Sequence, residues 1–147
     1  MLVLIIIAAG VGFFVYDPTA LGPGIVATTM PLVAITYDRA SADTIIVATP
    51  TPGAVVGKTF AIKGQARGIW YFEASFPIEV RDAAGTVLTT VVAQAEGEWM
   101  TTAFVPFTAT ATVPASYIGP ATIVLKKDNP SGLSEHDASA SYPITVE

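Results

Sequence analysis

The feature that most constrains the fold is a series of short runs rich in Val, Ile, Thr and aromatic residues, separated by Gly, Pro and Asp. The runs occupy residues 44–49, 59–65, 70–81, 86–94, 98–107, 121–127 and 139–146. No stretch beyond residue 40 keeps a helical period, and prolines recur throughout. Seven short strands spaced about 8–12 residues apart are typical of a β-sandwich. The sequence therefore predicts an all-β domain.

Several runs alternate between apolar and polar residues, as strands do when one face is buried. Phe60 and Ile62 point to one side, while Lys63 and Gln65 point to the other, and residues 78–81 repeat the pattern. Residues 82–85 (Asp-Ala-Ala-Gly) separate two such runs and predict a hairpin turn, because glycine accepts positive φ.

Large apolar side chains must stabilise this domain, because the chain has no cysteine and therefore no disulfide. Each buried aromatic residue contributes roughly 1.5–3 kcal/mol. Alternation through residues 70–76 places Tyr71 and Glu73 on the exposed face, where they could also form part of a peptide or carbohydrate platform. The predicted core residues are Trp70, Phe72, Phe76, Trp99, Phe104 and Phe107.

The first sixteen residues, MLVLIIIAAGVGFFVY, carry no charge. As a helix they would extend about 24 Å, slightly less than the roughly 30 Å hydrocarbon core. The segment predicts a single-pass membrane anchor; a cleaved signal peptide and a buried helix or strand are the alternatives. A signal peptide or a membrane anchor would normally have a Lys or Arg before the apolar run, and this sequence has none there.

A connector follows the anchor, because Pro18, Gly22, Pro23 and Gly24 would end any helix. We therefore divide the chain into an anchor or signal segment (1–16), a Pro- and Gly-rich linker (17–41) and the β domain (42–147). Residues 26–37 are rather apolar, and either add a strand to the domain or lie near the membrane surface.

Four blocks in the predicted domain resemble one known family, in the same order. They are residues 68–78 (GIWYFEASFPI), 97–102 (GEWMTT), 104–107 (FVPF) and 127–135 (KDNPSGLSE). The family is the immunoglobulin-like domain of bacterial spore germination, Gmad2. The resemblance implies an immunoglobulin-like antiparallel sandwich in an extracytoplasmic bacterial protein, often membrane- or lipid-anchored, without catalytic activity.

Composition and motifs argue against several chemistries. Seven basic against twelve acidic residues cannot form the basic surface that nucleic acids require. The single histidine, His136, lies in a polar loop, and we interpret it as exposed rather than catalytic. Residues 53–59 have one residue too few between their glycines for a phosphate-binding loop and lead into a strand. We therefore predict no enzyme, no cofactor, no nucleotide and no nucleic acid partner.

The loop from residue 128 to residue 137 is the strongest candidate for a specific site. Asp128, Glu135 and Asp137 supply oxygen ligands of the kind that calcium takes in groups of about six to eight. In the alternative, Asp128 and Asn129 form local turns and Gly132 adopts a left-handed conformation, so the loop is only a scaffold.

The leading hypothesis is a non-enzymatic envelope protein, anchored in the cytoplasmic membrane by residues 1–16, whose extracytoplasmic domain binds another envelope protein. The predicted binding surface is Tyr71, Glu73 and Asn129. A small calcium- or glycan-binding module that uses the 128–137 loop is the alternative.

Overall fold

The computed structural model describes residues 33–147, which fold almost entirely into strands. The strands are β1 (Thr36–Asp38), β2 (Ile45–Thr49), β3 (Val55–Val56), β4 (Thr59–Arg67), β5 (Ser75–Asp82), β6 (Val87–Ala95), β7 (Phe104–Thr112), β8 (Gly119–Lys126) and β9 (Ser139–Val146). Two single 3₁₀ turns, η1 (Gly68–Trp70) and η2 (Ser134–His136), interrupt them.

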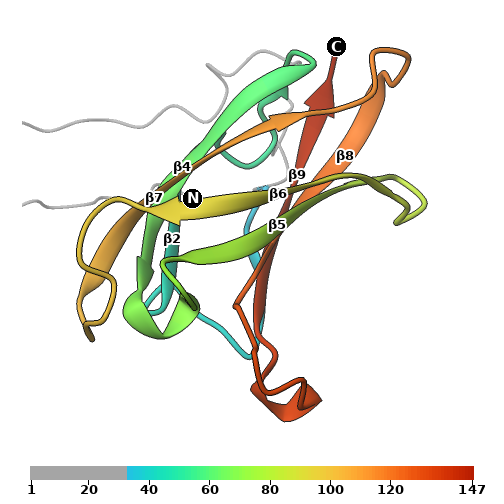
Figure 1. The fold of residues 1–147 in the computed structure, drawn as a ribbon. Helices are drawn as coiled ribbons and strands as arrows, with labels where there is room; N and C mark the ends of the chain where they lie inside the picture. The colour runs from blue at the N-terminus through green and yellow to red at the C-terminus, as the bar shows by residue number, and fades with distance from the viewer. Residues whose placement is uncertain (1–32) are drawn as a thin grey trace, which may run out of the picture. The chain divides into compact units, whose positions relative to one another are not determined.

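The strands form one hydrogen-bonded sheet in the order β1-β9-β8-β5-β6-β7-β4-β2, with β3 added beside β9. All pairs are antiparallel except β3 with β9. Between β6 and β7 the pairing shrinks to Gln94 with Thr108 and Ala95 with Phe107. The sheet folds over at this junction into an immunoglobulin-like sandwich of two layers (Figure 1).

The core lies between the two layers and follows the alternation in the sequence. In β4, Ile62, Gly64 and Ala66 are buried while the residues between them are exposed. Phe76 on β5 and Phe107 on β7 meet edge to face across the layers, with ring centroids 5.0 Å apart. Trp70 and Tyr142 are the largest fully buried side chains.

Gly64 shows how tightly neighbouring strands pack within one layer, since it pairs with Val47 on β2 and with Phe107 on β7. A Cβ atom at this position would lie 2.2 Å from the carbonyl oxygen of Ile46 and 2.8 Å from the Phe107 ring. Only a residue without a side chain fits here. The glycine therefore belongs to the core packing.

Two of the predicted strands begin later than expected. The run at 70–81 starts with η1 and a tight turn, so β5 begins only at Ser75. The run at 98–107 starts with an irregular loop, and β7 covers Phe104–Thr112. The hairpin at residues 82–85 forms as predicted: Gly85 has φ +87°, and the Asp82 carboxylate accepts hydrogen bonds from the amides of Ala84 and Thr86.

The domain starts earlier than residue 42. β1 pairs with β9 through Thr36 and Ser141, so part of the predicted linker is an extra strand. The predicted helix over residues 1–16 lies outside the described residues. Within residues 33–147, no helix has the length and apolar character needed to cross a membrane.

Candidate functional site

Four connections between strands gather at one end of the sandwich, which we call the loop end: residues 39–44, 68–74, 96–103 and 127–138. Because the strands run antiparallel, the ends of β1, β4, β6 and β8 and the starts of β2, β5, β7 and β9 lie at this same end (Figure 1). The opposite end holds residues 50–58, 83–86 and 113–118. The loop end contains most of the residues predicted to form a site.

A strained two-residue turn leads into β5. The amides of Phe72 and Ser75 each donate to the other's carbonyl, and the central residues Glu73 and Ala74 have φ +50° and +63°. Hairpin turns with two positive φ angles normally use Asn-Gly. The Ala95 amide donates to the Ala74 carbonyl at 2.8 Å, which helps to hold the turn in place. Such strain often marks a functional surface, because only a fixed environment maintains it.

The same segment corrects two predictions. Phe72 was predicted in the core but is 44% exposed, and Tyr71 was predicted on the surface but is 4% exposed. The η1 turn breaks the alternation, so both Trp70 and Tyr71 face inward. The Tyr71 hydroxyl donates to the Val105 carbonyl at 2.7 Å, and burial raises the pKa of Tyr71 to about 12. Glu73 is exposed at the tip of the turn.

Trp99 and Phe104 are half-buried rather than fully buried. Trp99 packs against the edge of the core from the irregular 96–103 loop. Phe104 lies on the outer face of β7, where the Arg67 guanidinium stacks 4.1 Å from its ring centroid. Both were predicted as core residues because they are large and apolar, but the irregular loop and the outer face of β7 leave each of them partly exposed. Trp70, Phe76 and Phe107 are fully buried.

Asn129 organises the 127–138 loop. Its side-chain amide donates to the Leu133 carbonyl at 2.8 Å and to the Asp137 carboxylate at 2.7 Å, and its side-chain oxygen accepts from the Ser131 hydroxyl at 2.5 Å. Gly132 has φ +68°. The loop is also tied to η1, because the Asp128 amide donates to the Trp70 carbonyl at 3.0 Å.

The three carboxylates predicted to bind calcium do not form a ligand set. In residues 33–147, no three acidic or histidine side chains gather closely enough to hold a metal ion. The Asp137 carboxylate already accepts from Asn129, while within residues 33–147 the carboxylates of Asp128 and Glu135 make no hydrogen bond. The hydrogen bonds within the loop are those of the scaffold alternative.

The loop also places Ser131 beside His136. The Ser131 hydroxyl lies 3.0 Å from Nδ1 of His136, but it also donates toward Asn129 and accepts from the Leu133 amide. Both residues are exposed. A nucleophilic serine also needs an oriented base and an oxyanion hole. Within the described chain, no carboxylate hydrogen bonds to this histidine, and we interpret the contact as part of the loop scaffold.

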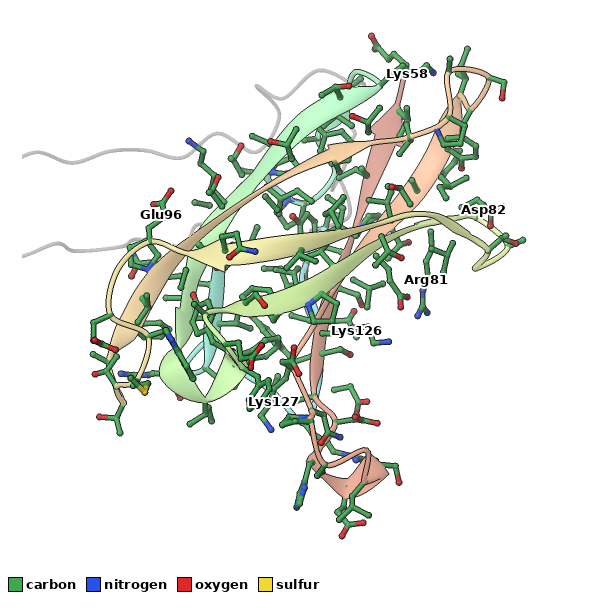
Figure 2. All side chains as sticks on the ribbon, in the orientation of Figure 1. Lys58, Arg81, Asp82, Glu96, Lys126 and Lys127 are labelled. Atoms are coloured by element: carbon green, nitrogen blue, oxygen red, sulfur yellow. The ribbon has the colours of Figure 1, made fainter. Side chains whose placement is uncertain are left out.

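The charge of the protein is concentrated at the loop end. Its four loops carry seven carboxylates and two basic residues, a formal charge of −5. The seven are Asp43, Glu73, Glu96, Glu98, Asp128, Glu135 and Asp137. The two basic side chains, Arg39 and Lys127, donate to the backbone carbonyls of Ser134 and His136. Arg67, at the end of β4, also reaches this end and donates to the Asp43 and Thr102 carbonyls. Figure 2 shows Glu96 and Asp82 at opposite ends of the β5–β6 hairpin.

None of these seven carboxylates has a salt-bridge partner in the described residues, where only Glu79 forms ion pairs. Glu79 lies on the outer face of β5, 2.8 Å from Nε of Arg81 and 3.1 Å from Nζ of Lys126. Burial alone would raise the pKa of Glu79, but hydrogen bonds and charges from Arg81 and Lys126 outweigh burial and lower it. The carboxylates of the loop end therefore remain without a basic partner among the described residues, whereas the Glu79 carboxylate on the sheet is neutralised by Arg81 and Lys126.

Large apolar side chains are exposed among these carboxylates. Ile69 is 61% exposed, Met100 73% and Leu133 50%, in addition to Phe72. They come from three different loops. Two of these loops touch, because the carbonyl oxygens of Trp99 and Thr101 in the 96–103 loop lie 2.4 and 1.9 Å from the position that a Cβ atom would take on Gly68. Strand alternation did not identify Ile69 or Met100, because neither lies in a strand.

The comparisons with known proteins cover most of the β domain, body and loop end together. The model of the immunoglobulin-like domain of bacterial spore germination, Gmad2, matches residues 44–134. No curated protein matches the sequence. Among solved structures, the crystal structure of CopC from Methylosinus trichosporium OB3b is similar, with a TM-score of 0.45 and 17% identity, over 71% of this chain and 92% of that chain.

Proposed function

The chain belongs to the family of the immunoglobulin-like domain of bacterial spore germination, and from this premise we propose that it is a non-enzymatic binding module of the bacterial envelope. In this proposal residues 1–16 anchor it in the cytoplasmic membrane and the β domain lies outside the cytoplasm. The domain binds another envelope protein through its loop end.

The observation that carries the proposal is the exposure of Ile69, Phe72 and Met100 around the strained 72–75 turn. Burying such side chains would stabilise the fold by roughly 25 cal/mol per Å² of apolar surface, so their exposure needs another explanation. Exposed apolar residues within a polar rim are typical of protein interaction sites. The strain at Glu73 and Ala74 supports the same interpretation.

Protein binding is favoured over the calcium- or glycan-binding alternative. The carboxylates of the 128–137 loop are not gathered as metal ligands among the described residues. A sugar platform would present flat aromatic faces, whereas Tyr71 is buried and the other strongly exposed apolar side chains of the loop end, Ile69, Met100 and Leu133, are not aromatic. The surface is therefore better suited to another protein.

The test is co-purification of partner proteins from the native envelope with the full-length chain as bait. Phe72→Ser and Met100→Ser should remove the partner. The matched controls are Val87→Ser and Ile118→Ser, which are 46% and 74% exposed at the opposite end. Loss of the partner in the controls alone, or in neither pair, would reject the loop end as the binding surface.

The location has a separate test. Fractionation of cells that express the full chain should place it in the cytoplasmic membrane. Protease added outside the cytoplasmic membrane should then digest the β domain. A protected domain would contradict the extracytoplasmic placement without affecting the assignment of the binding surface.

A further inference from the structure

We infer that the partner segment is basic and apolar: the loop end binds a stretch of protein in which Lys or Arg side chains alternate with aliphatic ones. This inference rests on the proposed function and adds the chemistry of the partner. Its two supports are the exposed apolar side chains and the unpaired carboxylates that surround them.

The apolar support comes from two loops that touch each other. The opposite end also exposes apolar side chains, Val87 and Ile118 among them, so the unpaired carboxylates are what distinguishes the loop end. Ile69 and Phe72 come from the 68–74 loop and Met100 from the 96–103 loop, and the two loops are in contact through Gly68. A partner that touches one of these loops can therefore also touch the other. Burial of these side chains supplies the non-directional part of the attraction.

The charge support comes from the unpaired carboxylates. Glu73 and Glu98 are exposed on the same two loops as the apolar side chains. Among the described residues no basic side chain lies within salt-bridge distance of either one, since both ion pairs there involve Glu79. The Glu98 carboxylate accepts a hydrogen bond only from the Met100 amide, at 3.0 Å. Both can receive hydrogen bonds from a partner's ammonium or guanidinium groups.

The negative charge of the loop end also disfavours other kinds of binding partner. Like charges face each other when this end approaches an anionic lipid surface, a nucleic acid or another acidic polymer, and such juxtaposition is unfavourable. A second copy of the chain would bring its own loop end of charge −5 to a symmetric contact. A basic segment is the partner whose charge is complementary.

The experiment uses the full-length chain in a zwitterionic detergent and three fluorescent peptides of equal length. One alternates Lys with Leu, one alternates Glu with Leu, and one alternates Lys with Ser. Binding is followed by fluorescence anisotropy. We expect the Lys-Leu peptide to bind on the order of tenfold more tightly than either of the other two.

Salt and charge-neutral variants complete the experiment. Raising the ionic strength from about 0.1 M to about 1 M shortens the Debye length from about 10 Å to about 3 Å and should weaken binding of the Lys-Leu peptide. Glu73→Gln and Glu98→Gln should each weaken it several-fold, and Gln at position 98 retains an oxygen for the Met100 amide. Glu147→Gln, an exposed carboxylate outside the loop end, is the matched control.

The inference is overturned if the Glu-Leu peptide binds as tightly as the Lys-Leu peptide, if no peptide binds, or if Glu147→Gln weakens binding as much as Glu73→Gln. Calcium binding that disappears in Glu73→Gln would also overturn it, by assigning the carboxylate to a metal. In each case the proposed function survives if Phe72→Ser and Met100→Ser still remove the envelope partner while their controls do not.

Discussion

The sandwich body, meaning the strands and the core between them, differs from the loop end in the burial of its aromatic side chains and in the pairing of its carboxylates. In the body, aromatic residues such as Phe76 and Phe107 are buried against each other, and the partly buried carboxylate of Glu79 is paired with two cations. At the loop end, Phe72 is exposed and the carboxylates are unpaired among the described residues. Stability is therefore concentrated in the body, and we propose that recognition is concentrated at the loop end.

The largest expected effect lies in the body. Phe76→Ala removes a ring that contacts Trp70, Tyr71 and Phe107 edge to face. It should lower the free energy of unfolding by about 3–5 kcal/mol, measured by denaturant titration with tryptophan fluorescence. Phe72→Ala at the half-exposed position should cost much less. Equal losses would remove the distinction between body and loop end.

Gly68→Ala tests how firmly the body supports the loop end. The new Cβ would lie 1.9 Å from the Thr101 carbonyl oxygen, and the backbone must shift to accommodate it. Overpacking of this kind should cost about 1–3 kcal/mol of unfolding free energy. Gly57→Ala is the control, because its Cβ meets no atom within 4 Å. A loop end that tolerated Gly68→Ala as well as the control would not be a fixed surface.

Asn129→Ala should loosen one loop without unfolding the domain. The substitution removes three hydrogen bonds at about 0.5–1.5 kcal/mol each, and all of them lie within residues 129–137. Hydrogen exchange should accelerate in this loop and stay unchanged in β8 and β9. Glu135→Gln is the control, because the Glu135 carboxylate makes no hydrogen bond within the described residues, and it should leave exchange unaltered. Acceleration throughout both strands after Asn129→Ala would contradict a role confined to the loop.

Ala74→Gly should stabilise the domain, in contrast to most substitutions. Ala74 has φ +63°, which glycine adopts without the cost of about 1–2 kcal/mol that L-residues incur. Denaturant titration should show a gain of up to about 1 kcal/mol. Ala84→Gly, in a turn residue without positive φ, should give a small loss instead. A loss at both positions would show that the 72–75 turn is unstrained.

Glu79 gives the smallest effect, and it depends on pH. Because its pKa is lower folded than unfolded, ionised Glu79 stabilises the native state above the unfolded value of about 4.3, and this contribution is lost as the pH falls through the folded pKa. The stability difference between wild type and Glu79→Gln should therefore be largest near neutral pH and shrink in acid. A difference that grew in acid would contradict the direction of the shift.

Alternation in the sequence was sufficient to predict the body. Strands β4, β5, β7 and β9 bury every second residue, and the 82–85 turn has both the glycine and the aspartate that its geometry uses. The loop end could not be predicted in this way. Whether Tyr71 and Phe72 face the core or the solvent depends on the 3₁₀ turn that precedes them. The position of Trp99 depends on contacts of its loop with Gly68.

One signal of the loop end was nevertheless present in the sequence. Once the strands are taken as antiparallel, alternate connections must lie at the same end. Glu73, Glu98 and Asp128 then fall together, although they are far apart in the chain. The exposure of Ile69 and Met100 depends on tertiary packing of their loops, which the alternation of apolar and polar residues in strands cannot predict.

The most direct test of the central claim is site-specific photo-crosslinking of the full-length protein in intact cells. A photoreactive amino acid replaces one residue at a time at positions 72 and 100, and at the equally exposed control positions 87 and 118. The account predicts the same protein adduct from positions 72 and 100, identified by mass spectrometry, and no such adduct from the controls. An adduct formed at 87 and 118 but absent at 72 and 100 would contradict it.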